Sequence, residues 1–181
     1  RNYGPLLPEE SYPLPPGGPC HECAGTIVES RTQELKVGQR VIVLPSSFCG
    51  LSEYIAEIPS RIIPVPKEGD LSNWLMCQPA GTVLWACQRL GTVLGQRVAI
   101  VGQGGIGLNF TAILSRLGAV QVIAVDLMDS RLRWSKEMGA THTVNASREN
   151  PIEAVKELPG GEGADIVVEA AGYPETVNMA L

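Results

Sequence analysis

Beyond residue 95, short apolar runs alternate with segments whose apolar residues recur at helical spacing. The apolar runs are residues 97–102, 120–126, 142–145 and 164–172. The segments with helical spacing are residues 105–118, 130–140, 151–158 and 174–181. Near-continuous apolar strands that alternate with helices are typical of a parallel sheet buried on both faces. This half of the chain is therefore predicted to have an α/β fold.

The first part of the chain has a different pattern. Residues 1–19 are rich in proline and glycine and are expected to form a loop. Short β-branched runs follow at 24–30, 40–45 and 53–66, broken by glycine, proline and serine, and they predict a β-rich unit. Residues 71–90 have helical spacing, with Pro79 able to start or kink a helix. We therefore expect one domain over residues 1–75 and a second over residues 76–181.

Composition narrows the class of protein. The 181 residues are 44% hydrophobic and carry a net charge of −5 with no basic block, which argues against nucleic acid as a partner. The sequence shows neither a bilayer-spanning apolar run nor a signal peptide, so no membrane partner is expected. Five scattered cysteines do not suggest a disulfide framework, and a cytoplasmic location is expected. Because the chain starts at Arg1 and stops inside a predicted helix, we expect a piece of a longer polypeptide.

A glycine pattern stands where the first strand of this second half passes into a helix. Gly102, Gly104 and Gly107 follow the spacing GxGxxG of dinucleotide-binding loops. In such loops the first glycine permits a sharp turn, the second lets the backbone approach a pyrophosphate, and the third lets helix and strand pack closely. The amides of Gly105 and Ile106 at the helix start would face the phosphates. The alternative is a tight strand–helix turn without a ligand.

An acidic residue ends the second strand of this half. Asp126 lies 19 residues after Gly107, where a carboxylate can accept both ribose hydroxyls of adenosine and repel the extra phosphate of NADP. The alternative is a solvated aspartate that caps the next turn. Arg131 could instead bind a 2′-phosphate, but it belongs to the following helix, so NAD is favoured over NADP.

The segment CHEC, residues 20–23, holds a histidine and a glutamate between two cysteines. A redox or zinc pair of Cys20 and Cys23 is disfavoured, because a strand from Ala24 would direct close neighbours to different faces. On the sequence alone, His21 could equally be an ordinary hydrogen-bonded histidine with Glu22 beside it. Cys49, Cys77 and Cys87 are expected to be small buried side chains.

Taken in order, these motifs resemble the medium-chain dehydrogenase/reductase superfamily, which includes zinc alcohol and sorbitol dehydrogenases and quinone reductases. The segments that carry the resemblance are HECAGTIVES, KVGQRV, QPAGTVLWA, VAIVGQGGIG to VDLMDSR, GATHTVN and GADIVVEAAG. The resemblance implies a Rossmann-type parallel sheet preceded by part of a GroES-like catalytic domain.

The resemblance also implies roles for individual residues. His21 matches the catalytic zinc histidine, and Glu22 the glutamate that binds or neighbours the zinc. Arg131 matches a basic residue at the adenosine ribose, and Thr82 a threonine near the nicotinamide. Gln78 stands where many zinc members carry a further ligand. The stretch between Val43 and Tyr54 is too short for a structural-zinc lobe, so no structural zinc is expected.

Three functions follow as hypotheses. The first is an NAD-dependent, zinc-assisted dehydrogenase that acts on a small secondary alcohol or polyol. The second is a zinc-free NAD(P)H reductase of quinones or enones, and the third is a dinucleotide-binding module without catalysis. A homo-oligomer is expected for the full-length form.

Overall fold

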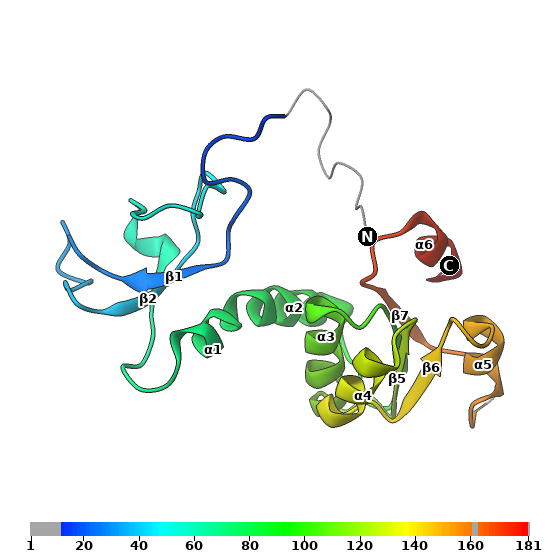
Figure 1. Ribbon diagram of the computed structural model, residues 1–181. Coiled ribbons are helices and arrows are strands. Elements are labelled where there is room, and N and C mark those ends of the chain that lie inside the picture. The colour runs from blue at the N-terminus through cyan, green and yellow to red at the C-terminus, as the bar shows by residue number, and fades with distance from the viewer. Residues whose placement is uncertain (1–11, 161–162, 181) are drawn as a thin grey trace. The chain divides into compact units, whose positions relative to one another are not determined.

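The computed structural model describes residues 12–160 and 163–180 (Figure 1). The chain divides into two compact units, one ending at Gln78 and one beginning at Pro79. The division lies three residues beyond the boundary expected after residue 75. Within the described residues, no helix is both long and apolar enough to cross a membrane.

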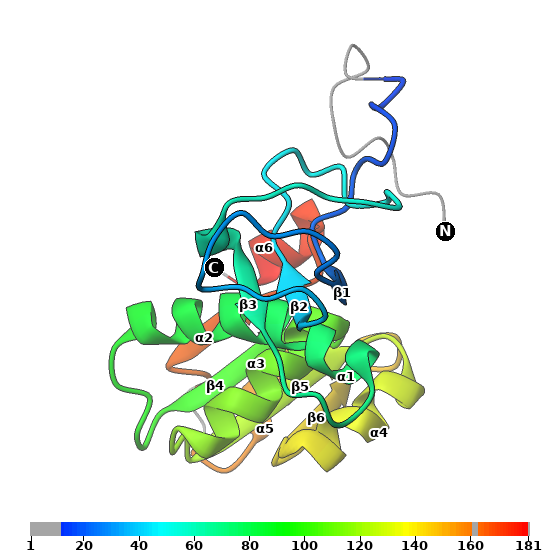
Figure 2. The same cartoon turned by 90° about the vertical axis from the view of Figure 1, so that its left-hand side faces the viewer.

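The first unit contains a small antiparallel sheet, whose strands are labelled in Figure 2. The strands are β1 (Cys23–Thr26), β2 (Arg40–Val43) and β3 (Ile62–Pro64), in the order β1-β2-β3. Ile27, Leu35 and Val41 form its buried core. The strands are shorter than predicted, because the chain from residue 53 to 58 has no ladder partner and Pro59 opens a 3-10 turn, η2 (Pro59–Arg61). Proline has no N–H to donate to a neighbouring strand.

The helical pattern of residues 71–90 forms two helices instead of one. Helix α1 (Leu71–Leu75) begins after Asp70, whose carboxylate accepts a hydrogen bond of 2.9 Å from the Ser72 amide. Helix α2 (Cys77–Leu90) carries Pro79 in its first turn, where a missing N–H loses no helical hydrogen bond. If a single helix continued, the ring of Pro79 would clash with the carbonyl of Leu75, the residue at which α1 ends. The sequence identified Pro79 as a start or kink, and the structure shows the break that it makes.

The second unit contains the predicted parallel sheet. Its strands are β4 (Arg97–Val101), β5 (Gln121–Asp126), β6 (His142–Asn145) and β7 (Ile166–Glu169). They pair in the order β6-β5-β4-β7, and every pairing is parallel. The helices of this unit are α3 (Gly105–Arg116), α4 (Asp129–Met138), α5 (Pro151–Glu157) and α6 (Pro174–Ala180). All four strands and four helices predicted beyond residue 95 are present, and β7 differs most from its predicted bounds, 164–172.

The helices cover both faces of this sheet. Helices α3 and α4 lie on one face and α5 on the other (Figure 1). The change of face follows from handedness, since β6 and β7 lie on opposite sides of β4 and crossovers between parallel strands are right-handed. Alternate residues of β4 enter the two cores: Val98 and Ile100 pack with α2 and α3, whereas Ala99 and Val101 face α5 and α6. Burial on both faces explains why the strand sequences are almost wholly apolar.

After β4 and after β7 the chain passes to opposite faces of the sheet. Beyond β4 it enters α3 on one face, and beyond β7 it enters α6, whose Met179 packs on the other face. Two adjacent strands whose connections diverge in this way define a topological switch point. Open α/β sheets bind their ligands outside the carboxyl ends of the strands at such a point.

Candidate dinucleotide-binding site

Two of the three patterned glycines are required by packing. Gly102 has φ of 92°, a left-handed conformation, and a Cβ there would lie 2.7 Å from the Ala171 amide nitrogen. A Cβ on Gly107 would lie 1.8 Å from the carbonyl oxygen of Gly102. Glycine at these positions therefore shapes the turn and brings α3 close to β4, whether or not a ligand is present.

The other glycines of the loop lie in open space. Gly104 is the N-cap of α3 with φ of −74°, which any residue can adopt, and no side chain caps this helix. A Cβ on Gly104 or Gly105 would meet no atom within 4 Å, and Ile106 is partly exposed at the same helix end. Space beside an uncapped helix N-terminus fits an approaching anion, because amide groups and the helix dipole favour negative charge there. The loop thus has the shape that a pyrophosphate needs.

Asp126 is buried at the end of β5, with 8% of its surface exposed. Its Oδ2 accepts a hydrogen bond of 2.7 Å from the Gln103 amide, and its Oδ1 accepts one of 2.9 Å from the Met128 amide. The carboxylate therefore fixes the glycine loop and also caps the turn after β5, although it is not the solvated group of the alternative interpretation. Oδ1 retains a second lone pair that a ribose hydroxyl could use, whereas Oδ2 also faces Arg131.

Arg131 lies in the first turn of α4 and faces the same carboxylate. Its Nη1 lies 3.4 Å from Asp126 Oδ2, and 44% of its side chain is exposed. The predicted ribose-binding pair is therefore brought together by the structure. An arginine already paired with Asp126 is less available to a 2′-phosphate than an isolated guanidinium would be.

Gln103 is a buried residue of the loop that sequence analysis did not identify. Its Oε1 accepts hydrogen bonds from Thr111 Oγ1 at 2.8 Å and Ser135 Oγ at 2.9 Å, and its Nε2 donates to the Ile100 carbonyl at 3.1 Å. The side chain thereby joins β4, α3 and α4. The signal in the sequence was Thr111, a polar residue on the apolar face of a predicted helix, since a buried hydroxyl requires a partner.

Glu169 fixes the loop that packs against Gly102. Its Oε1 accepts hydrogen bonds from Thr176 Oγ1 at 2.7 Å and from the amides of Ala171 and Gly172, both at 2.9 Å. Burial opposes ionisation of this carboxyl, but the three hydrogen bonds outweigh it and lower the pKa of Glu169 below its ordinary value. The loop after β7 is consequently held in place at the switch point.

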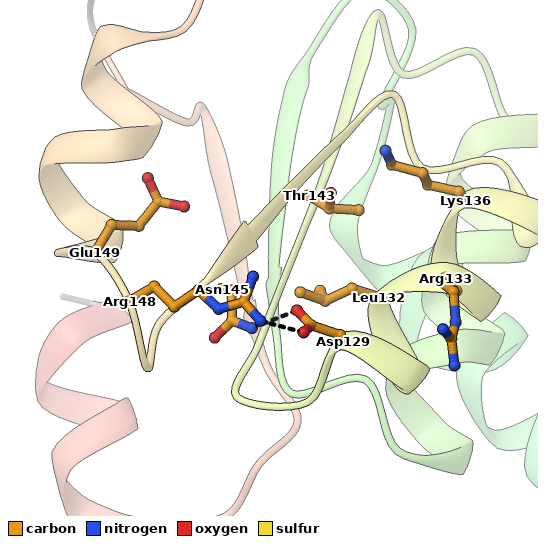
Figure 3. A pocket seen from close by; sticks show the side chains of 8 residues that line it. All are labelled: Asp129, Leu132, Arg133, Lys136, Thr143, Asn145, Arg148 and Glu149. Carbon is orange, nitrogen blue, oxygen red and sulfur yellow. Dashed lines mark hydrogen bonds and ion pairs between the residues drawn. The ribbon is translucent and has the colours of Figure 1, made fainter.

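A surface hollow of about 330 Å³ lies between α4 and the end of β6 (Figure 3). It is lined by Asp129, Leu132, Arg133, Lys136, Thr143, Asn145, Arg148 and Glu149. Asn145 donates a hydrogen bond of 2.6 Å to Asp129, and Arg148 pairs with the same carboxylate. The predicted cofactor residues are not among those that line this hollow.

The segment around His21 belongs to the first unit. His21 and Glu22 are both exposed, and the His21 ring contacts the edge of Phe48 with centroids 5.4 Å apart. The flanking sulfurs, Cys20 Sγ and Cys23 Sγ, lie 3.7 Å apart. The expectation that Cys20 and Cys23 point to different faces is therefore wrong, because residues 21–22 leave regular strand geometry before β1 begins at Cys23.

The remaining cysteines differ in burial. Cys87 is buried in the core, as predicted, but Cys77 is exposed and Cys49 is half-buried. Burial, with the contact to Cys20, raises the pKa of the Cys23 thiol to about 11.

Thr82 is exposed on α2, in the second unit.

The described residues do not by themselves complete a metal site. Among them, no group of three or more histidine, cysteine, aspartate or glutamate side chains could hold a metal ion. His21 and Glu22 offer an imidazole and a carboxylate, which zinc accepts, but a catalytic zinc needs three protein ligands. His21 and Glu22 therefore supply at most two of the three ligands.

The strand order, the glycine turn and the position of the buried carboxylate are those of a Rossmann-type domain. The sequence pattern described as zinc-binding dehydrogenase matches residues 105–181. A zinc-type alcohol dehydrogenase-like protein of Escherichia coli is 30% identical over 207 residues, covering 98% of this chain and 59% of the relative. Sorbitol dehydrogenase of Bacillus subtilis is 30% identical over 190 residues, covering 89% of this chain and 54% of the relative.

Solved structures agree with this assignment. A zinc-binding dehydrogenase from Sinorhizobium meliloti, bound to NADP, has a TM-score of 0.75 and 26% identity, covering 88% of this chain and 56% of that one. The chain belongs to the medium-chain dehydrogenase/reductase superfamily and matches its zinc-type alcohol and sorbitol dehydrogenases. The expected fold class, with Rossmann and GroES-like parts, is confirmed. The chain spans a little over half the length of the relatives named here.

Proposed function

We propose that this chain is part of an NAD-dependent dehydrogenase that transfers hydride between the nicotinamide and a small secondary alcohol or polyol, or its ketone. The observation that carries the proposal is the contrast within the glycine loop. Gly102 and Gly107 are closed in by backbone atoms, whereas Gly104 and Gly105 face open space at the uncapped start of α3. Packing alone accounts for the first two glycines, and a bound pyrophosphate accounts for the others.

The residues then take distinct roles. The amides from Gly104 to Gly107 bind the pyrophosphate, and Asp126 accepts hydrogen bonds from the adenosine ribose. Arg131 neutralises part of the Asp126 charge from the solvent side. Thr82 is assigned to the nicotinamide by its match to the superfamily. When bound, NAD supplies the ring that accepts or returns the hydride.

We propose NAD as the preferred cofactor. A 2′-phosphate would approach the buried Asp126 carboxylate, where weak solvent screening strengthens repulsion. Releasing Arg131 to bind that phosphate would break its contact with Asp126. The Sinorhizobium meliloti relative is bound to NADP in its structure, so the proposal of NAD for this chain rests on its own Asp126 and Arg131.

We also propose that His21 and Glu22 contribute to a zinc site in the full-length protein, with the further ligands supplied from outside the described residues. The match to zinc-type relatives supports this assignment. Zinc content of the full-length protein after dialysis, compared with a His21→Ala variant, tests it. Equal zinc in both proteins would exclude His21 as a ligand.

A small secondary alcohol or polyol is the proposed substrate class, because a matched relative is a sorbitol dehydrogenase. The alternative of a zinc-free quinone or enone reductase predicts a different substrate profile. Oxidation of polyols with NAD supports the dehydrogenase, whereas NADPH-dependent reduction of enones alone contradicts it. A cytoplasmic location and a homo-oligomeric state remain predictions.

The role of Asp126 is tested with two aspartates that lie three residues apart. Asp126→Asn removes the buried charge, and we expect it to weaken NADH binding about tenfold, equivalent to about 1.4 kcal/mol. Asp129→Asn is the matched control, because Asp129 pairs with exposed Arg148 and should leave NADH affinity unchanged. Calorimetric titration of the full-length proteins with NADH measures both effects. Equal affinities for the wild type and Asp126→Asn would reject the role of Asp126 in binding.

A further inference from the structure

The backbone positions of Cys20 and Cys23 are both fixed by pairing with neighbouring chain segments. Cys20 forms a parallel bridge with Cys49: its amide donates to the Phe48 carbonyl at 2.6 Å, and its carbonyl accepts from the Gly50 amide at 3.0 Å. Cys23 opens β1 and pairs with Val43 of β2. The proximity of the two sulfurs therefore follows from hydrogen-bonded backbone on both sides of residues 21–22.

The two sulfurs face each other although an extended strand would separate them. Side chains three positions apart in a strand point to opposite faces. Here residues 21–22 are irregular, and Cys20 Sγ lies 3.7 Å from Cys23 Sγ. The Cys23 sulfur occupies space that a side chain at position 50 would fill, since a Cβ on Gly50 would lie 2.1 Å from that sulfur. Glycine at position 50 therefore leaves room for the Cys23 sulfur in the position where it lies near Cys20.

The pair is also asymmetric in exposure. Cys23 is 8% exposed, whereas Cys20 is half-buried and reachable from solvent. A reagent from solution therefore meets Cys20 first, and Cys23 is placed to attack whatever forms there. One accessible thiol beside a second, buried thiol is the arrangement of a reactive cysteine with a resolving cysteine.

We propose that Cys20 and Cys23 are a redox-active dithiol that closes to an intramolecular disulfide on reaction with a low-molecular-weight disulfide. The Cys20 thiolate attacks one sulfur of the reagent, forming a mixed disulfide and releasing the first small thiol. Cys23, on losing its proton, then attacks the Cys20 sulfur and releases the second small thiol. Two protein thiols are oxidised, one reagent disulfide is reduced to two thiols, and a reducing thiol reverses both steps.

The disulfide would link the residues on either side of His21 and Glu22, which are proposed to contribute to a zinc site. His21 and Glu22 lie between the two cysteines, so a disulfide would close a covalent ring that includes the backbone carrying both side chains. This consequence rests on the proposed function of His21 and Glu22, whereas formation of the disulfide does not. Oxidation is accordingly expected to lower dehydrogenase activity, and dithiothreitol is expected to restore it.

Peptide masses of the full-length protein test the disulfide directly. Cleavage after lysine and arginine places Cys20 and Cys23 together, without another cysteine, in the peptide of residues 2–31. After treatment with glutathione disulfide and alkylation without reduction, this peptide should carry no alkyl group and weigh two hydrogens less than its reduced form. The peptide of residues 68–89, with Cys77 and Cys87, is the internal control and should not form an internal disulfide.

Two variants distinguish the roles of the cysteines. Cys23→Ser should leave glutathione attached to Cys20, and Cys20→Ser should leave Cys23 reduced. A wild-type peptide that retains glutathione on Cys20, or a crosslink to the Cys49 peptide of residues 41–61, would overturn the proposal. Disulfide formation with unchanged activity would overturn the link to His21 and Glu22. An enzyme that is inactive even when reduced would instead reject the proposed function, and the peptide mass would still report on the dithiol.

Discussion

Gly105 and Gly107 lie two residues apart at the start of α3 and have opposite surroundings. A Cβ on Gly107 would penetrate the Gly102 carbonyl oxygen, whereas a Cβ on Gly105 would meet no atom within 4 Å. Glycine at position 107 is therefore needed for packing, whereas glycine at position 105 lies beside open space. The glycine spacing was readable from the sequence, but this division of roles requires the positions of the surrounding backbone atoms.

Alanine substitutions separate these two roles. Gly107→Ala should lower the free energy of unfolding by roughly 3 kcal/mol, because backbone must move to admit the Cβ. Gly105→Ala is the control and should stay within about 1 kcal/mol of the wild type, since alanine is favoured over glycine in a helix. Urea unfolding of both variants measures the difference. Equal stability of the two variants would contradict the packing role of Gly107.

Residue types alone predicted the loop and Asp126, but not all of their partners. The spacing from Gly107 to Asp126 suggested a ribose contact, and the structure adds that the carboxylate also fixes the loop through the Gln103 amide. Gln103 occupies a variable position of the GxGxxG pattern, so the pattern gave no reason to single it out. Its importance depends on Thr111 and Ser135, which are distant in sequence and meet it only in the fold.

At the scale of elements, Gln103 joins the start of the loop to two helices. Gln103→Leu leaves Thr111 Oγ1 buried without its acceptor, and we expect a loss of about 2 kcal/mol in the free energy of unfolding. Thr111→Val removes the orphaned hydroxyl, so the double variant should lose at least about 0.5 kcal/mol less than the sum of the single variants. Urea unfolding of the four proteins measures this coupling. Additive losses would show that the two side chains do not interact.

A second connection joins the start of β4 to the residue just before β7. Asp165 accepts hydrogen bonds from Arg97 Nε at 3.1 Å, Arg97 Nη2 at 2.8 Å and the Arg97 amide at 2.7 Å. The side-chain hydrogen bonds from Arg97, followed by the amide, lower the pKa of Asp165 from 3.8 to about 2. A folded-state pKa below the unfolded value stabilises the fold above the unfolded pKa, and this stabilisation is lost as pH falls toward the folded pKa.

The Asp165→Asn variant makes this dependence measurable. The difference in free energy of unfolding between wild type and variant should be constant above about pH 5 and shrink as pH falls from about 4 toward 2. Denaturant titrations at a series of pH values give the difference directly. A gap that stays constant down to about pH 3 would mean that Asp165 does not titrate in this way.

Elements were predicted best where both faces of a strand are buried. Most side chains of strands β4 to β7 enter a core, which leaves few alternatives to an apolar pattern, and β6 was predicted at its observed bounds. The first unit was predicted less well, since its small sheet leaves many residues exposed. There the effects of Pro59 and Pro79 on backbone geometry decided the outcome more than hydrophobic pattern did.

At the scale of the whole molecule, the order of motifs identified the superfamily before any single motif could. The β-rich unit, the proline-interrupted helix and the strand–glycine–helix unit follow one another in the chain, and the relatives match across both units. The chain spans a little over half the length of those relatives, so the proposed dehydrogenase activity is a prediction for the full-length protein. The residues proposed to bind the dinucleotide, by contrast, all belong to the second unit.

Calorimetric titration of the full-length protein with NADH and with NADPH compares the two cofactors directly. We expect NADH to bind at least about tenfold more tightly, a difference of about 1.4 kcal/mol, because the buried Asp126 is proposed to accept ribose hydroxyls and to repel a 2′-phosphate. Tighter binding of NADPH, or no binding of either cofactor, would contradict the assigned roles of Asp126 and the glycine loop.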